Sequence, residues 1–337
     1  MQMNDFVSNS THKLFNLVAK PEFCRQLFVW HLKNLDLWLY TKKHFSSYII
    51  VDFSGRRLRS PIGVAAGYDV NGECIKGLRR IGFGFVEIGT VTPEPQSARH
   101  PQSDHKNWDG SIFYVPHRAN DGFDKVYDNL LKYRQKKGKS CIGVNIGHSN
   151  HLDPVPDYVL GIKKFQDVAD YVSFNVTTDE EGSKFHELNV SNLLSLIPEV
   201  KKVINESKAE KPLQIFLKLS PELSDEECVE ISKIIQDPET AVDGIILTNG
   251  RSEKKKDLDG RLGGRPLKDF TKERIKLFYK LTNGSVQIIA SGGIQDGQDA
   301  YDMIACGASF VQIYTSFTET GYGTPMKINK SLNYLTV

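Results

Sequence analysis

The sequence has few cysteines, no long apolar run and almost no net charge, and each shortage narrows the possible functions. The cysteines show no CxxC spacing, which argues against a zinc site or disulfide framework and fits a reducing compartment. The five are Cys24, Cys74, Cys141, Cys228 and Cys306. The net charge is +2 and no basic stripe is interleaved with aromatic residues, so we expect no nucleic-acid partner. Lys254-Lys255-Lys256 is expected to be a solvated loop tip.

The first 45 residues lack the segment order of a signal peptide, and no run is long enough to cross a bilayer. Thr11–Lys20 and Pro21–Tyr40 are instead predicted to form two short helices, with Pro21 in the first turn of the second. The second is rich in apolar residues with basic flanks. Both a helical pair packed on the main domain and a membrane-surface helix, or the mouth of an apolar ligand tunnel, fit this pattern. We expect an N-terminal helical microdomain over 1–45 and one domain over 46–337.

The remaining chain alternates short apolar, β-branched runs with helical patterns, which indicates a parallel sheet. A hairpin over 48–59, turning at Ser54-Gly55, precedes eight such runs. They are Ile62–Ala65, Phe85–Ile88, Cys141–Ile146, Tyr171–Asn175, Ile215–Leu219, Gly244–Leu247, Gln287–Ala290 and Phe310–Ile313. Eight strands predict an α/β fold closed into a (β/α)8 TIM barrel. A doubly wound open sheet would need an early GxGxxG after a strand, and Gly82-Phe83-Gly84 comes before its strand.

Small and polar residues follow nearly every predicted strand, where parallel barrel strands share one rim. The segment 286–317 is the most informative, because Gly292-Gly293 follows one strand and precedes a helix. Backbone N–H groups of such a turn can close on a phosphate, and the helix adds its positive end. Asn145, Asn175 and Asn249 end three other strands, and Lys218 lies on a fourth. This pattern predicts a flavin-sized, polar-lined site for a phosphorylated cofactor.

Eight motifs, in this order and spacing, carry a resemblance to a known family. They are SPIGVAAGYDVNGE (60–73), GFGFVEIGTVTPEPQ (82–96), IGVNIG (142–147), YVSFNVTT (171–178), FLKLSPELSD (216–225), DGIILTN (243–249), GRLGGRPLKDF (260–270) and the segment 286–317. The chain resembles the class 2, membrane-associated, quinone-reducing dihydroorotate dehydrogenases from roughly residue 11 to its end. The predicted N-terminal helical pair is the feature that separates class 2 from the soluble classes.

The resemblance implies oxidation of dihydroorotate to orotate, with FMN as cofactor and a quinone as electron acceptor, in pyrimidine biosynthesis. It also implies a peripheral membrane protein, here on the cytoplasmic side because no targeting peptide is recognised. Lys218 would lie near the electron-rich end of the flavin ring and stabilise its reduced form. The implied FMN contacts are Ala65, Ala66, Gly67, Thr90, Asn145, Asn175, Lys218, Thr248, Gly264, Gly292, Gly293, Tyr314 and Thr315.

The chain departs from the family pattern mainly around the implied substrate. Thr178 replaces the serine that acts as catalytic base, and it keeps a hydroxyl that can relay a proton. Glu180 and Ala119 replace two substrate-binding asparagines, which leaves Asn175 and Asn249. A carboxylate about 4 Å from the substrate carboxylate would repel it by roughly 4 kcal/mol at an effective dielectric near 20. That corresponds to about a thousandfold in affinity.

Two further departures fall on the implied flavin side, where Val70 replaces a lysine and Gly263 replaces a serine.

Two hypotheses about the function follow from the resemblance and these departures. The first is a divergent but active dihydroorotate dehydrogenase, in which Thr178 removes the substrate proton. The second is a flavoprotein paralogue of the same fold with lost or changed dihydroorotate activity, which acts on another small molecule or as a binding or regulatory protein.

Overall fold

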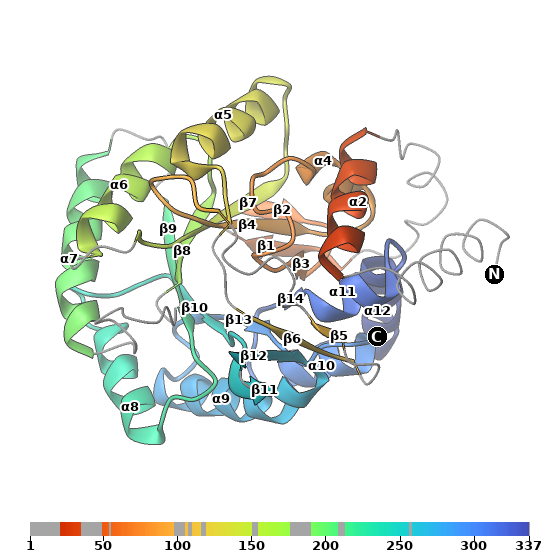
Figure 1. Cartoon of the computed structure of the whole chain (residues 1–337). Helices are drawn as coiled ribbons and strands as arrows, with labels where there is room; N and C mark the ends of the chain where they lie inside the picture. The colour runs from red at the N-terminus through yellow and green to blue at the C-terminus, as the bar shows by residue number, and fades with distance from the viewer. Residues whose placement is uncertain are drawn as a thin grey trace, which may run out of the picture.

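The computed structural model describes residues 21–34, 49–53, 55–97, 105–106, 110–115, 119–149, 154–175, 190–207, 213–255 and 258–336. Eight parallel strands close a barrel at the centre of the molecule (Figure 1). Around the barrel they are β10 (Gly244–Leu247), β13 (Gln287–Ser291), β14 (Phe310–Ile313), β3 (Ile62–Val64), β4 (Phe85–Val91), β7 (Cys141–Ile146), β8 (Tyr171–Asn175) and β9 (Gln214–Leu219). The predicted (β/α)8 barrel is therefore confirmed, and four of the eight strands have the predicted bounds.

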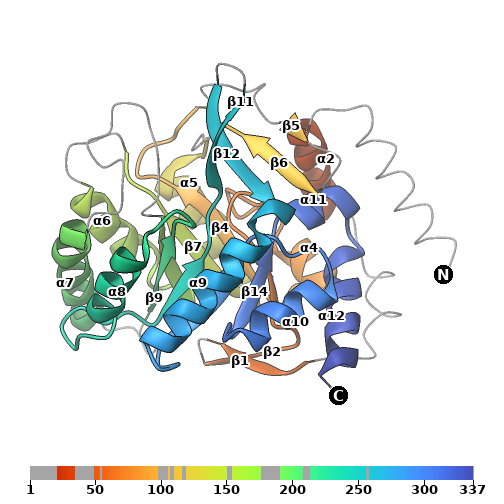
Figure 2. The ribbon, with the colours of Figure 1, turned by 90° about the horizontal axis from the view of Figure 1, so that it is seen from below.

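Helices form an outer ring around these strands (Figures 1 and 2). They are α4 (Ile75–Arg80), α5 (Gly122–Gln135), α6 (Val155–Phe165), α7 (Val190–Glu206), α8 (Asp225–Ile234), α9 (Lys268–Leu281), α10 (Gly297–Ala305), α11 (Thr315–Thr320) and α12 (Thr324–Leu335), with a 3-10 turn, η1 (Arg265–Leu267), before α9. Local sequence sets their starts. At α8, for example, the Ser224 hydroxyl accepts from the Glu227 N–H, and the Glu227 carboxylate accepts from the Ser224 N–H.

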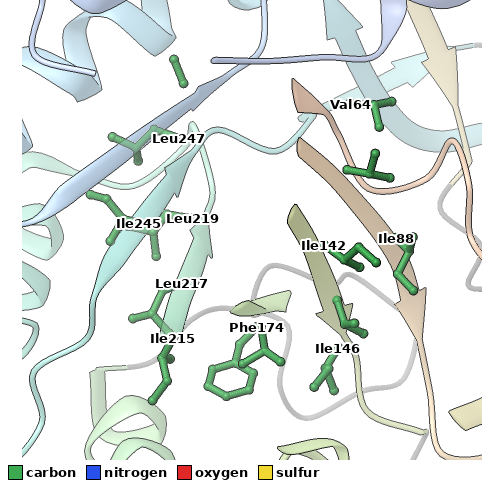
Figure 3. Close-up of a cluster of buried hydrophobic side chains, with 14 of the residues drawn as sticks. Val64, Ile88, Ile142, Ile146, Phe174, Ile215, Leu217, Leu219, Ile245 and Leu247 are labelled. Atoms are coloured by element: carbon green, nitrogen blue, oxygen red, sulfur yellow. The ribbon is translucent and has the colours of Figure 1, made fainter. Parts of the chain in front are cut away.

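Two apolar layers hold the barrel together, one on each face of its wall. The outer layer joins the strands to the helices, and Figure 3 shows part of it on β3, β4 and β7 to β10. The inner layer closes the amino end of the barrel as a floor, and it consists of Phe53, Leu58, Phe85, Cys141, Tyr171, Phe216, Ile246, Ile289 and Phe310.

The predicted hairpin supplies the centre of this floor. It forms β1 (Val51–Phe53) and β2 (Arg56–Leu58), which pair antiparallel. The Phe53 ring lies 5.1 Å from the ring centroid of Tyr171 and 4.4 Å from that of Phe310. Glycine at Gly143 leaves room for the Tyr171 ring, because a Cβ there would overlap its phenol carbon and oxygen. The floor therefore depends on large aromatic side chains that lie against glycines on the neighbouring strands.

The described part of the N-terminal region is one helix, α2 (Pro21–Asn34). It packs on α4 so closely that a Cβ on Gly77 would overlap the Leu32 carbonyl. Lys33 Nζ lies 2.6 Å from a Glu73 carboxylate oxygen. The predicted helix Thr11–Lys20 and residues 35–48 lie outside the described residues, so the predicted helical pair is seen only in its second member. Among the described helices, none is long and apolar enough to cross a membrane.

A second, four-stranded sheet was not anticipated from the sequence. It has the order β11 (Arg251–Lys255), β12 (Leu258–Gly264), β6 (Ser111–Tyr114) and β5 (His105–Lys106). The lysine run was expected to be a loop tip, and this was wrong for its first two residues, because Lys254 and Lys255 belong to β11. The Lys254 side chain is exposed as expected, and Lys256 lies outside the described residues.

Candidate functional site

The carboxyl ends of the barrel strands gather the predicted site residues at one rim. The positions come from all eight strand ends and from the second sheet. Ala65, Ala66 and Gly67 follow β3, Thr90 lies in β4, Asn145 in β7, Asn175 ends β8, Lys218 lies in β9, Thr248 and Asn249 follow β10, Gly292 and Gly293 follow β13, Tyr314 and Thr315 follow β14, and Gly264 ends β12. The closed parallel topology makes these segments neighbours although they span most of the chain.

The glycine turn after β13 has a backbone that only glycine adopts readily. Gly292 has φ +121° and Gly293 has φ +78°. A Cβ on Gly292 would lie 3.0 Å from the Thr271 hydroxyl oxygen and 3.2 Å from that of Thr248. A Cβ on Gly293 would overlap the backbone of Lys268, the first residue of α9. The turn is thus a close-packed backbone surface with threonine hydroxyls beside it.

The helix after this turn contributes less than the sequence suggested. The Asp296 side chain accepts from the Asp299 N–H at 3.0 Å, and the Asp299 carboxylate accepts from the Gln295 N–H at 2.8 Å. Asp299 is also paired with Lys268, at 2.5 Å. The chain's own carboxylates therefore occupy the start of α10, so the anion-binding capacity of this region rests on the glycine turn itself.

Two other glycines bring strand ends together at the rim. Gly67 has φ +101°, and a Cβ there would lie 3.4 Å from the Tyr314 ring. Gly264 has φ +90°, and a Cβ there would lie 3.0 Å from the Thr315 methyl carbon. These approaches leave backbone rather than side chains at the rim, which is the usual role of glycine where a ligand comes close.

Asn145 is held in a defined orientation inside the barrel. Its Oδ1 accepts from the Thr90 hydroxyl at 2.6 Å, while its Nδ2 donates to the Ser173 hydroxyl at 2.7 Å and to Glu87 at 3.3 Å. The opposite orientation would place Oδ1 against the Glu87 carboxylate, so this network assigns the amide direction.

Glu87 is the centre of this network, and its role was missed from the sequence. Its side chain is fully buried and accepts four hydrogen bonds. Besides Asn145, the donors are the Tyr171 hydroxyl at 3.0 Å, the Ser173 hydroxyl at 3.0 Å and Gln312 Nε2 at 2.6 Å. A group that only accepts, from four donors, is an ionised carboxylate. A lone glutamate at an inward position of an apolar strand was the available signal.

Lys218 is a buried cation on which the negative charge of Glu87 acts. It is only 6% exposed, and among the described residues its ammonium group has no hydrogen-bond or ion-pair partner. Burial lowers the pKa of Lys218, and the negative charge of Glu87 acts in the opposite direction. A buried ammonium group without a direct partner is costly to keep, which marks the position as functional rather than structural.

The positions expected around the substrate are only partly described. The Asn249 N–H donates to the Leu219 carbonyl at 3.1 Å, and its Oδ1 accepts from the Gly250 N–H at 3.0 Å. Ala119 is half-buried, and Val70 accepts the Gly89 N–H through its carbonyl. At Gly263 a Cβ would find ordinary contact distances of 3.4 Å or more. Thr178 and Glu180, and the side chain of Asn175, lie outside the described residues.

The fold and these residues define a (β/α)8-barrel protein with a polar, glycine-rimmed site and a buried lysine at the carboxyl ends of its strands. The sequence profile described as "Dihydroorotate dehydrogenase" matches residues 48–335. The chain therefore belongs to the dihydroorotate dehydrogenase family, whose members are oxidoreductases.

Individual relatives agree with this assignment. The chain is 30% identical over 331 residues to the mitochondrial dihydroorotate dehydrogenase (quinone) of Mus musculus, covering 94% of this chain and 82% of that protein. It is 32% identical over 287 residues to dihydroorotate dehydrogenase (quinone) of Rhodospirillum rubrum, covering 82% and 77%. The ligand-free crystal structure of the Eimeria tenella enzyme superposes with a TM-score of 0.85 at 29% identity, covering 94% of this chain and 95% of that one.

Proposed function

We propose that this protein oxidises dihydroorotate to orotate with FMN as cofactor and passes the electrons to a quinone. The observation that carries the proposal is Lys218, a buried ammonium group without a direct partner among the described residues, on a strand whose carboxyl end shares its rim with the glycine turn. The names of the relatives, dihydroorotate dehydrogenase (quinone), support the substrate and the acceptor.

The donor set at the rim fits FMN. The backbone N–H groups of the glycine turn at Gly292 and Gly293 would hold the phosphate, because this positive-φ backbone carries no side chain. Lys218 would place a positive charge beside the ring, and Thr90 with Asn145 would supply oxygen acceptors. The remaining contacts proposed are Ala65, Ala66, Gly67, Asn175, Thr248, Gly264, Tyr314 and Thr315. When bound, FMN supplies the two-electron acceptor that the side chains of this protein lack.

The substrate side is proposed from the sequence. Asn175 and Asn249 would bind dihydroorotate, and the Thr178 hydroxyl would take the proton that leaves as the hydride is transferred. The quinone would enter past the N-terminal helices, which would also contact the membrane surface from the cytoplasmic side. In support of that contact, Trp30 on α2 is 55% exposed, an unusual position for so large an apolar side chain.

A second candidate is a flavoprotein paralogue with lost or changed dihydroorotate activity. It is favoured by the replacements at the substrate, namely Ala119 and Glu180, together with Val70. Two of these remove hydrogen-bonding groups, and Glu180 introduces a charge of the same sign as the substrate carboxylate.

Anaerobic mixing of the purified protein with dihydroorotate tests the proposed function. We expect a yellow protein whose flavin absorbance bleaches on mixing and returns when a quinone is added. Lys218→Met should slow the bleaching by about a hundredfold, because a fixed charge at the reacting ring is lost. Lys272→Met is the matched control, since Lys272 pairs with Asp302 on the outer ring of helices and should leave the rate unchanged. A colourless protein that ignores added FMN contradicts the cofactor assignment.

Glu180→Asn separates the two candidates. If Glu180 lines the substrate site as a carboxylate, the wild type bleaches slowly and Glu180→Asn is faster, while the neighbouring change Glu181→Asn has no effect. Fast bleaching of the wild type, unaltered by Glu180→Asn, supports the plain dihydroorotate dehydrogenase. No bleaching by any of the three proteins, in a yellow preparation, supports the paralogue.

A further inference from the structure

The barrel interior contains a buried carboxylate that no step of the proposed reaction uses. Glu87 lies above the aromatic floor and below the rim, on β4, and Lys218 lies across the interior on β9. Both side chains are buried, at 0% and 6% exposure. An isolated buried charge costs several kcal/mol, and two opposite charges in the same interior reduce that cost for each other.

The strands between them carry a connecting hydrogen-bond network. Around the barrel wall, β4 is followed by β7, β8 and then β9. Asn145 on β7 and Ser173 on β8 are register partners, and they both bond Glu87 as well as each other. Lys218 is the register partner of Asn175, the residue two positions after Ser173 on β8. The hydrogen bonds of Glu87 therefore extend to β8, the strand that pairs with β9 and so lies next to Lys218.

The hydrogen bonds to Glu87 come from the sides and from below, and none comes from a cation among the described residues. Its donors are two hydroxyls and two amides, which are neutral, so its negative charge is oriented but not cancelled. Its charge acts favourably on Lys218, a buried cation of the same interior. A carboxylate in the barrel interior adds no apolar packing, so what its four donors preserve is its charge.

We propose that Glu87 is a positioning residue that supplies the counter-charge for Lys218 from inside the barrel, so that Lys218 meets the cofactor as an ammonium ion. The role toward a flavin rests on the proposed function, whereas the coupling of the two side chains does not. The arrangement keeps the counter-charge beneath Lys218 and away from the rim, so the positive charge remains available to a ligand.

The other titratable groups around Lys218 leave this role to Glu87. Tyr171 faces the same interior, but burial and the Glu87 charge raise the pKa of its hydroxyl well above the usual value, so it is neutral. Cys141 lies lower, in the aromatic floor. Residues 176–189, which contain four carboxylates after β8, lie outside the described residues.

Lysine NMR on the full-length protein tests the coupling. The protein is labelled with 13C at lysine Cε, and the Lys218 signal is identified as the one missing in Lys218→Met. In Glu87→Gln we expect Lys218 to lose its proton at lower pH, so that its neutral fraction at a fixed pH rises about tenfold, the effect of a nearby opposite charge. Glu87→Asp, which keeps the carboxylate, should restore most of the wild-type titration.

Asp170→Asn is the matched control. Asp170 is also buried, but it lies at the amino end of β8 and is paired with Arg56 and Arg134. Its loss should destabilise the protein without moving the Lys218 titration. An unmoved Lys218 in Glu87→Gln, or an equal movement in Asp170→Asn, overturns the proposal, because the effect would then be absent or merely structural.

An exchanged variant covers the case in which Glu87→Gln does not fold. Glu87→Gln combined with Gln312→Glu keeps one carboxylate and one amide in hydrogen-bond contact in the same interior, so Lys218 should titrate as in the wild type. Lysine NMR of this variant reads the result, and a Lys218 that loses its proton at clearly lower pH overturns the proposal. Neither measurement needs FMN. A colourless protein would contradict the proposed function, whereas this inference depends only on how the Lys218 titration responds to the variants.

Discussion

Replacing Tyr171 by phenylalanine removes a single hydroxyl from the barrel interior and leaves the ring packing in place. The ring is fully buried, 5.1 Å from the centroid of Phe53 and 5.3 Å from that of Phe216. The hydroxyl donates to Glu87 at 3.0 Å. Tyr171→Phe therefore leaves the floor intact and takes one of four donors from a buried carboxylate.

The expected effect on stability depends on pH, and its sign can be worked out. Near pH 8 the lost donor should cost about 1–3 kcal/mol of the free energy of unfolding. In the folded protein, burial and the Glu87 charge raise the pKa of Tyr171 well above 10, whereas in the unfolded chain the hydroxyl ionises near pH 10. Between these two values the folded state binds one more proton than the unfolded state. The wild type then loses about 1.4 kcal/mol per pH unit through this residue, and phenylalanine does not.

Urea unfolding of both proteins from pH 8 to pH 11 measures this difference. We expect the deficit of Tyr171→Phe to be constant up to about pH 9.5 and then to shrink by about 1.4 kcal/mol for each further pH unit. Tyr334→Phe, at an 87% exposed position, is the control and should follow the wild type throughout. Parallel curves for wild type and Tyr171→Phe above pH 10 would refute the assignment of Tyr171 as a donor to an ionised Glu87.

Two further predictions concern the cofactor and the membrane. Gly293→Asp should abolish FMN uptake in a titration, because it adds bulk and negative charge at the proposed phosphate turn; Gly284→Asp, at another glycine with positive φ, should still take up FMN. If Gly293→Asp still took up FMN, the phosphate site would have to lie at another place than this turn. Deleting residues 1–44, and more mildly Trp30→Ser, should lower co-sedimentation with anionic liposomes, whereas Tyr334→Ser should not. Unchanged sedimentation would contradict the membrane contact and leave α2 with only the role of packing on the barrel.

The sequence predicted the barrel because its strands carry a local signal. Segments such as Cys141–Ile146 and Phe310–Ile313 are short apolar runs, bounded by turn residues and spaced by helices. Their burial on both faces explains why they read as continuous apolar runs rather than as alternating patterns. The errors are confined to ends, as in β4, which continues three residues past Ile88 to Val91.

The second sheet could not be predicted, because its pairing is not local. Arg251–Lys255 is polar, and Leu258–Gly264 contains three glycines, so neither has a strand pattern. β12 forms a strand by pairing with β6, and Gly264 lies opposite Ser111, far away in the sequence. Only the closed barrel brings these segments to the same rim.

The sequence predicted the site residues at the barrel rim, but it did not predict the polar residues inside the barrel. Strand ends such as Asn145 and Lys218 could be predicted because parallel strands place their carboxyl ends together. Glu87, Tyr171 and Gln312 were absorbed into strands that read as apolar, although each is a polar residue at an inward position. The roles of Thr178 and Glu180 stay predictions from the sequence.

The aromatic floor has a consequence for the synthesis of the chain on the ribosome. Phe53 leaves the ribosome early, but its nearest aromatic neighbour in the floor is Phe310, on the last strand of the barrel. At about 5–20 residues per second, the interval between residues 53 and 310 lasts on the order of 10–50 s. For that time the nascent chain carries Phe53 and the other rings of the floor without their final partner. The floor, at the end of the barrel opposite the proposed chemistry, can therefore be completed only after β14 has been synthesised.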